Sequence, residues 1–129
     1  MRSRILFVSG HPDDARRLSR MLHSLPLVVD HAETLQQARA MLQQDDYCVI
    51  LTEADFPDGN WLDALHLARQ SPQELEVIVT DPLADARLWA EVLNLGAYDM
   101  LAQPFYEPEV RRILYNACSR ASALAVAAG

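Results

Sequence analysis

The stretch from Tyr47 to Gly59 constrains the fold of this chain more than any other part of the sequence. It begins with five apolar or aromatic residues, Tyr-Cys-Val-Ile-Leu, which are too few for a helix and are typical of a strand buried on both faces. A Pro-Asp-Gly turn signal then precedes a helical run that begins near Trp61. Ligands bind at the carboxyl ends of strands in open parallel sheets, so we expect the functional site between these two elements. The polar residues at that point are Thr52, Glu53 and Asp55.

Short apolar runs alternate with helical patterns along the whole chain. Besides the central strand, we expect strands at residues 5–8, 27–29, 75–80 and 98–101. Helices are expected at about 12–25, from 33 or 34 to the polar residues 43–46, and at 60–70, 83–95 and 107–123. This alternation predicts an α/β domain, with a doubly wound parallel sheet of five strands flanked by five helices. A length of 129 residues fits one such domain, which we place at residues 1–123, followed by the start of a linker or tail at 124–129. We expect the chain to be a piece of a longer protein.

The charge balance argues against a nucleic-acid partner. Eleven Lys+Arg against 18 Asp+Glu give a net charge of −7, which repels phosphate backbones. No apolar run approaches the ~18 to 20 residues of a membrane-spanning helix. The apolar run near the N-terminus is too short for a secretory signal. We therefore expect a cytoplasmic protein that contacts neither a membrane nor, through this domain, a nucleic acid.

The two cysteines show neither metal-ligand spacing nor a disulfide framework around them. Cys48 falls in the central strand and Cys118 in the last helix, so we expect both to be small buried apolar residues. The histidines also lack the close spacing of a ligand pair, and we expect a solvated surface position for them. Those scattered over helix and strand ends are His23, His31 and His66.

Residues 95–105, Leu-Gly-Ala-Tyr-Asp-Met-Leu-Ala-Gln-Pro-Phe, resemble the pattern Leu-Gly-Ala-x-Asp-Tyr-Leu-x-Lys-Pro-Phe of bacterial response-regulator receiver domains. Residues 47–59 are similar to the phosphorylation strand and loop of the same family, an apolar run followed by Asp-Leu-x-Met-Pro and a Gly. The resemblance extends from about Arg4 to Arg120. It implies a flavodoxin-like receiver fold with strand order 2-1-3-4-5, and a cis peptide bond between Gln103 and Pro104.

The resemblance places Glu53 where the family has its phosphoacceptor Asp. Glutamate is one methylene longer than aspartate, so an acyl phosphate on it would be misplaced. The acidic pair that holds Mg²⁺ in the family falls at Ser9 and Gly10, and we therefore expect Mg²⁺ binding to be weak or absent, with no other cofactor. Asp13 and Asp14 follow in the first turn of a helix, where a capping role is expected.

Other positions of the family's pocket are also changed. The Lys before Pro104 becomes Gln103, and the switch aromatic on the fifth strand becomes Met100. The phosphate-binding Thr or Ser falls at Asp81 by an ungapped count, or at Thr80 after one residue of slippage. In the polar pocket that remains, Gln103 is expected to donate a hydrogen bond to Glu53. The residues of this degenerate pocket are Ser9, Gly10, Glu53, Asp55, Thr80, Asp81, Gln103 and Pro104.

The loop after the first strand does not match two other site types that occur in similar sheets. A flavodoxin-type FMN site needs a run of hydroxyls and glycines, whereas Ser9-Gly10-His11-Pro12 has one hydroxyl and a Pro without a donor. A cobalamin site would need Asp-x-His-x-x-Gly, and His11 lacks both partners. A carboxylate metal site is disfavoured because turn and capping preferences explain Asp58 and Asp63.

The resemblance implies a degenerate receiver, a non-enzymatic module of signal transduction or transcription regulation. It would act by contact with a protein partner or an attached output domain, without phosphorylation. The alternatives are a competent phosphoacceptor of a two-component system and a receiver fold adapted to bind a small ligand.

The fourth helix is apolar on more than one face, which predicts a homodimer interface formed with the fifth strand and the fifth helix. We expect Ala86, Ala90 and Leu93 to face the sheet. The residues then expected at the interface are Leu88, Trp89, Val92 and Met100.

Overall fold

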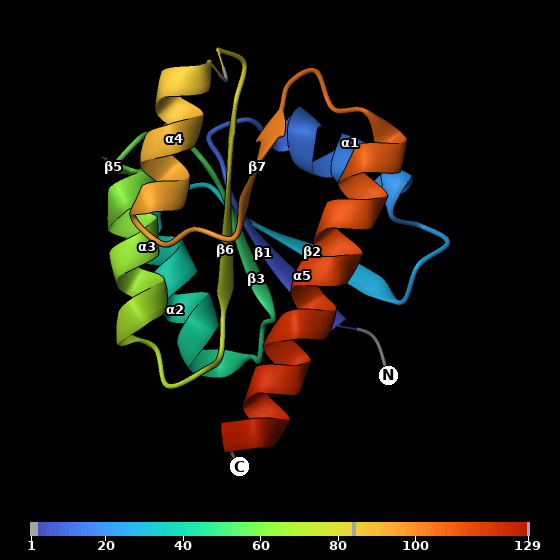
Figure 1. Cartoon of the computed structure of the whole chain (residues 1–129), viewed down its shortest axis with the longest axis vertical. Helices are drawn as coiled ribbons and strands as arrows, with labels where there is room; N and C mark the ends of the chain where they lie inside the picture. Colours follow the sequence, from blue (N-terminus) through green and yellow to red (C-terminus); the bar gives the residue numbers. More distant parts are fainter. Residues whose placement is uncertain (1–2, 84, 129) are drawn as a thin grey trace.

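A five-stranded parallel sheet forms the centre of the computed structural model, which describes residues 3–83 and 85–128 (Figure 1). Its strands lie in the order β2-β1-β3-β6-β7. This is the predicted order 2-1-3-4-5, because β4 and β5 form a separate two-stranded hairpin. The strands are β1 (Ser3–Val8), β2 (Leu27–Ala32), β3 (Val49–Glu53), β4 (Asp55–Phe56), β5 (Gly59–Asn60), β6 (Glu76–Asp81) and β7 (Asp99–Ala102).

Helices cover both faces of the sheet, as Figure 1 shows, with α1 and α5 on one face and α2, α3 and α4 on the other. Their bounds are α1 (Pro12–Met21), α2 (Leu35–Gln44), α3 (Trp61–Gln70), α4 (Ala86–Asn94) and α5 (Glu107–Ala128). Successive strand residues point to opposite faces, so each strand contributes to two separate cores. In β3, for example, Ile50 packs with α2 and α3, whereas Leu51 packs with α1 and α5. This two-sided burial explains why the strands read as continuous apolar runs.

Side-chain caps fix where the helices begin. Thr34 caps α2, and Asn60 forms a reciprocal capping box with Asp63 at the start of α3. Asp58 also accepts hydrogen bonds from the backbone of α2, at Leu35 N and Gln36 N. Asp58 and Asp63 are thus capping residues, as predicted.

Gly96 ends α4 with a φ of 102°, the left-handed conformation predicted for it. The peptide bond between Gln103 and Pro104 is cis, as the family resemblance implied.

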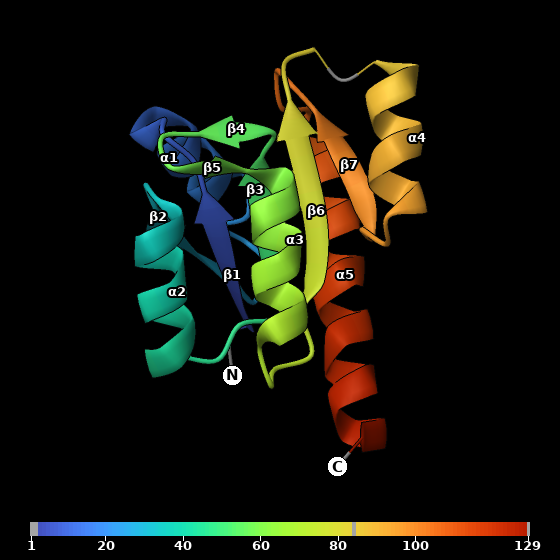
Figure 2. The same ribbon diagram turned by 90° about the vertical axis from the view of Figure 1, so that its left-hand side faces the viewer.

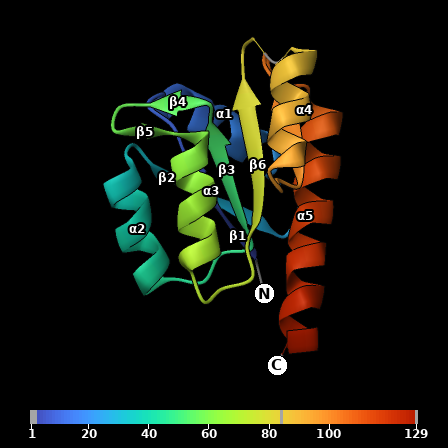
Figure 3. The same cartoon turned by 60° about the vertical axis from the view of Figure 1, so that its left-hand side comes forward.

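Several element boundaries differ from the prediction. Helix α1 ends at Met21, not near residue 25, and Arg111 of α5 donates a hydrogen bond to the Met21 carbonyl. Helix α5 continues to Ala128, beyond the predicted end at 123, and projects below the rest of the structure (Figure 3). The expected turn after the central strand is a short hairpin, which lies across the top of α3 (Figure 2). Of the segment predicted as a linker or tail, residue 129 lies outside the described residues.

The prediction that the two cysteines are unpaired was wrong. Cys48 and Cys118 are buried, as expected, but their sulfur atoms form a disulfide, with Cα atoms 5.0 Å apart. The two residues are 70 positions apart in the sequence, so their spacing carried no signal. They meet because α5 packs across the start of β3.

The predicted orientation of α4 was also wrong. Val92 is fully buried against the sheet, and Leu88 and Trp89 are half-buried on the same side. Met100 is fully buried in β7 and cannot contribute to a surface. The exposed stripe of α4 is instead formed by the three residues expected to face the sheet, Ala86, Ala90 and Leu93. The helix is apolar on several faces, so hydropathy alone did not fix its rotation.

None of the helices in the described ranges combines the length and hydropathy that a membrane span requires.

Candidate functional site at the carboxyl end of the sheet

A cavity of about 210 Å³ lies where β1, β3, β6 and β7 end. Four acidic side chains line it together with one imidazole, one amide and one proline. All eleven basic residues of the sequence are arginines, and none of those in the described ranges lines this cavity. The lining residues are His11, Asp14, Glu53, Asp55, Asp81, Pro82 and Gln103.

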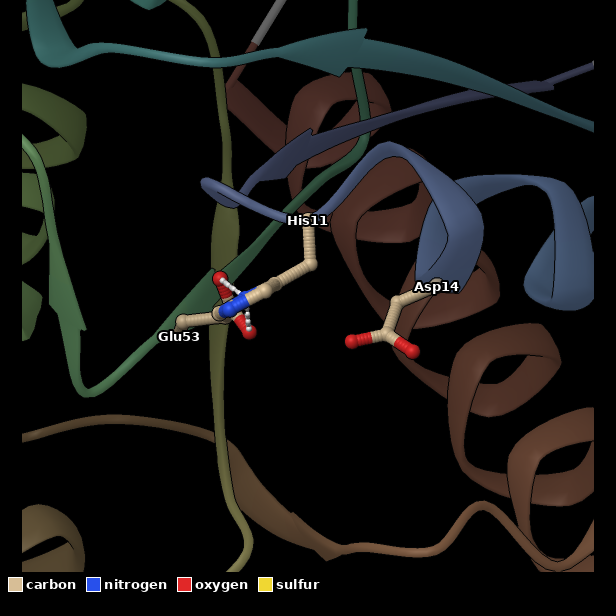
Figure 4. Close-up of side chains that lie close together, drawn as sticks. All are labelled: His11, Asp14 and Glu53. Atoms are coloured by element: carbon tan, nitrogen blue, oxygen red, sulfur yellow. Dashed lines mark hydrogen bonds and ion pairs between the residues drawn. The ribbon is translucent and has the colours of Figure 1, made fainter.

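Glu53 is the buried centre of the site, with only 6% of its surface exposed. It is the last residue of β3, and the loop after β1 covers it. The backbone N–H of Gly10 donates a hydrogen bond of 3.0 Å to Glu53 Oε1. The imidazole Nδ1 of His11 lies 3.0 Å from Oε1 and 2.9 Å from Oε2 (Figure 4). Both carboxylate oxygens therefore have partners within the chain.

The loop after β1 is built to hold His11 in this place. Ser9 is fully buried, and its hydroxyl accepts a hydrogen bond of 2.9 Å from the backbone N–H of His11. The Ser9 carbonyl is bound in turn by Nε2 of His31, at 2.7 Å. His31 is half-buried in this contact, so the expectation of a solvated position was wrong for it, whereas His23 and His66 are exposed as expected.

Asp14, for which a capping role was expected, and His11 both line the cavity. Sequence reasoning missed His11 as a residue of the candidate site. The residues around His11 exclude a cobalamin site. Its place in the loop after β1 nevertheless puts it beside the carboxyl end of β3. The strands β1 and β3 are neighbours in the predicted sheet order, so the loops that follow them lie side by side. This order is the signal that places His11 next to Glu53.

Asp81, and not Thr80, lines the cavity. The Thr80 hydroxyl is fully buried, donates to the Leu101 carbonyl at 2.8 Å and accepts from the Gln103 amide at 3.2 Å. Asp81 accepts a hydrogen bond from the backbone N–H of Leu83 and turns the chain toward α4. The expected hydrogen bond from Gln103 to Glu53 is absent among the described residues, because the amide reaches Thr80 instead.

The residues do not fit the Mg²⁺ site that the receiver resemblance implies. The Ser9 hydroxyl is occupied by the backbone of His11, and Gly10 offers only an N–H group, which donates to Glu53. A Cβ at Gly10 would lie only 3.2 Å from Cδ of Pro57, so a larger side chain would crowd the loop. Mg²⁺ favours oxygen ligands in octahedral geometry, whereas the side chain that contacts Glu53 is an imidazole.

The contact with Glu53 raises the pKa of His11 above its ordinary value of 6.5, first through their hydrogen bond and then through the charge of the carboxylate. The pair thus contributes stability that is fully present below pH 6.5 and is lost as the pH rises through the folded-state pKa. The His11 side chain is 69% exposed, so solvent screens this contribution.

An NMR titration of the imidazole signals checks this contact. We expect the pKa of His11 to lie above 6.5 in the wild type and to fall in Glu53→Gln, where the carboxylate charge is removed. A His11 titration that is the same in both proteins would contradict the contact.

Comparisons with known proteins bear on the fold and the family of the chain. The family described as "Response regulator receiver domain" matches residues 5–115. The response regulator protein PilR of Pseudomonas aeruginosa is 25% identical over 116 residues, which cover 90% of this chain and 26% of PilR. The chain thus spans about a quarter of the length of that relative.

Solved receiver structures share the fold. The signal receiver domain of a putative LuxO repressor protein from Vibrio parahaemolyticus superposes with a TM-score of 0.90 at 21% identity, covering 100% of this chain and 99% of that one. The beryllofluoride-activated NtrC4 receiver domain dimer gives a TM-score of 0.82 at 22% identity, covering 92% of this chain and 98% of that one. The chain belongs to the response regulator receiver domain family, the signalling domains of two-component response regulators.

Proposed function

We propose that this receiver domain regulates a partner or an attached output domain by protein contact, without accepting a phosphoryl group. The observation that carries the proposal is the state of Glu53. Its carboxylate is buried and already bound by the Gly10 N–H and the His11 imidazole. For a Glu53 oxygen to attack the phosphorus of a phosphodonor, the donor would have to displace His11 and reach an oxygen that the loop covers.

The charges around Glu53 also oppose phosphoryl transfer. Protein groups promote this reaction chiefly by neutralising the charge of the transferred group, with metal ions and basic side chains. Here the cavity presents Asp14, Asp55 and Asp81 to an incoming phosphate, and Gln103 replaces the family's Lys without carrying charge. The acidic pair that would hold Mg²⁺ is replaced by Ser9 and Gly10.

The partner surface that we propose is the exposed face of α4. The stripe of Ala86, Ala90 and Leu93 is continuous along the helix at spacings of four and three residues, and Leu83 precedes it with 80% of its surface exposed. A second copy of the chain is the occupant we favour, since the similar NtrC4 receiver forms a dimer. The similar LuxO-type receiver belongs to a putative repressor, which supports transcription regulation as the process controlled.

Sedimentation velocity with and without acetyl phosphate and Mg²⁺ tests this proposal. We expect the wild type to self-associate equally in both conditions. Leu93→Asp should shift it toward monomer, because a charge would lie in the apolar stripe. Leu62→Asp on α3 is the matched control, since Leu62 and Leu93 are both 43% exposed. A wild type that associates only after treatment with the phosphodonor would contradict the proposal.

A further inference from the structure

We propose that His11, Asp14 and Glu53 form a binding site for a divalent transition-metal cation of the Zn²⁺ class. One possible ligand atom from each residue lies within 4.8 Å of the other two. These ligands differ from the acidic pair of the family, which falls at Ser9 and Gly10 in this chain. The argument for this site rests on the positions of its three side chains and not on the proposed function.

The distances suit a metal of small radius. Zn²⁺ binds imidazole nitrogen and carboxylate oxygen at about 2.0 to 2.2 Å, which places the ligand atoms of a tetrahedral site about 3.3 to 3.6 Å apart, a little farther than in a hydrogen bond. His11 Nδ1 already lies 2.9 Å from Glu53 Oε2. The Asp14 carboxylate lies on the same side of α1 as the imidazole and faces the pair, as Figure 4 shows. A small side-chain movement would bring all three atoms to a shared cation.

The ligands are held by rigid elements. Glu53 ends a strand in the middle of the sheet, and the Gly10 N–H bond orients its carboxylate. His11 and Asp14 are three residues apart at the first turn of α1, so they lie on the same side of the helix. The Ser9 hydroxyl fixes the backbone of His11. Such outer contacts orient metal ligands and contribute to affinity.

The donor set selects the class of cation. One neutral imidazole and two carboxylates balance a charge of +2, and imidazole nitrogen favours Zn²⁺ and its neighbours over Mg²⁺ or Ca²⁺. The three ligands line the same cavity of about 210 Å³ as Asp55, Asp81 and Gln103, whose polar groups could form hydrogen bonds with metal-bound water. No arginine of the described residues lines the cavity, so its four acidic groups also attract a cation.

The test is a calorimetric titration of tag-free, non-reduced protein with ZnCl₂, with MgCl₂ titrated in parallel. We expect one Zn²⁺ per chain and no comparable binding of Mg²⁺. His11→Ala and Asp14→Asn should each weaken Zn²⁺ binding by about tenfold or more. The matched controls, His23→Ala and Asp13→Asn, remove the same groups at exposed positions and should leave the affinity within about twofold.

Absence of Zn²⁺ binding by the wild type would overturn the proposal, as would equal losses in the site variants and their controls. NMR of the wild type with Co²⁺ gives a second measurement that needs no variant. The largest paramagnetic shifts should fall on residues around His11 and Glu53, and shifts centred on another part of the chain would also overturn the proposal.

Discussion

Val92→Asp should destabilise the domain by on the order of 4 kcal/mol or more, because it places a charge in a fully buried apolar position. Val92 packs with strand and helix residues on the α3 side of the sheet, and no water can reach a carboxylate there. Leu93→Asp, one position later, should change the free energy of unfolding by only about 0.5 kcal/mol, since Leu93 is 43% exposed.

Urea denaturation followed by far-UV circular dichroism measures both variants. The comparison tests the rotation of α4 directly, because the orientation predicted from the sequence would bury Leu93 and expose Val92, the reverse of the structure. A larger loss for Leu93→Asp than for Val92→Asp would contradict the structure.

Removal of the Cys48–Cys118 disulfide should lower the free energy of unfolding by about 2 to 4 kcal/mol. The bond closes a loop of 70 residues, and opening it increases the conformational freedom of the unfolded chain. The double variant Cys48→Ser/Cys118→Ser and the reduced wild type should unfold at the same urea concentration, below that of the oxidised wild type. Two thiols that react with a thiol reagent in denatured, non-reduced wild type would contradict the bond.

Much of the fold could be predicted because several local signals agree. The central strand, the turn after it and the left-handed Gly96 each rest on a few neighbouring residues. The order of the strands followed from the family pattern around residues 95–105, which also implied the cis bond before Pro104. These predictions depend on the conformational preferences of residues that are neighbours in the sequence, so a local pattern is enough to make them.

The errors concern contacts between residues far apart in the sequence. The His11–Glu53 pair is separated by 42 positions in the sequence and the disulfide by 70. No local sequence pattern indicates contacts over such separations. Gln103 binds Thr80 and not Glu53, a choice that depends on where the side chains point. The rotation of α4 was ambiguous because Leu93 and Val92 are equally apolar and the helix has more than one apolar face.

We propose above that this receiver domain acts without accepting a phosphoryl group. Intact-protein mass spectrometry after incubation with acetyl phosphate and Mg²⁺ measures this directly, with a phosphorylatable receiver as positive control. We expect no added phosphoryl group on the wild type. Glu53→Asp alone should not restore one, because Ser9, Gly10 and Gln103 still lack the metal-binding and charge-neutralising groups. A stoichiometric phosphoryl adduct on the wild type would contradict the account.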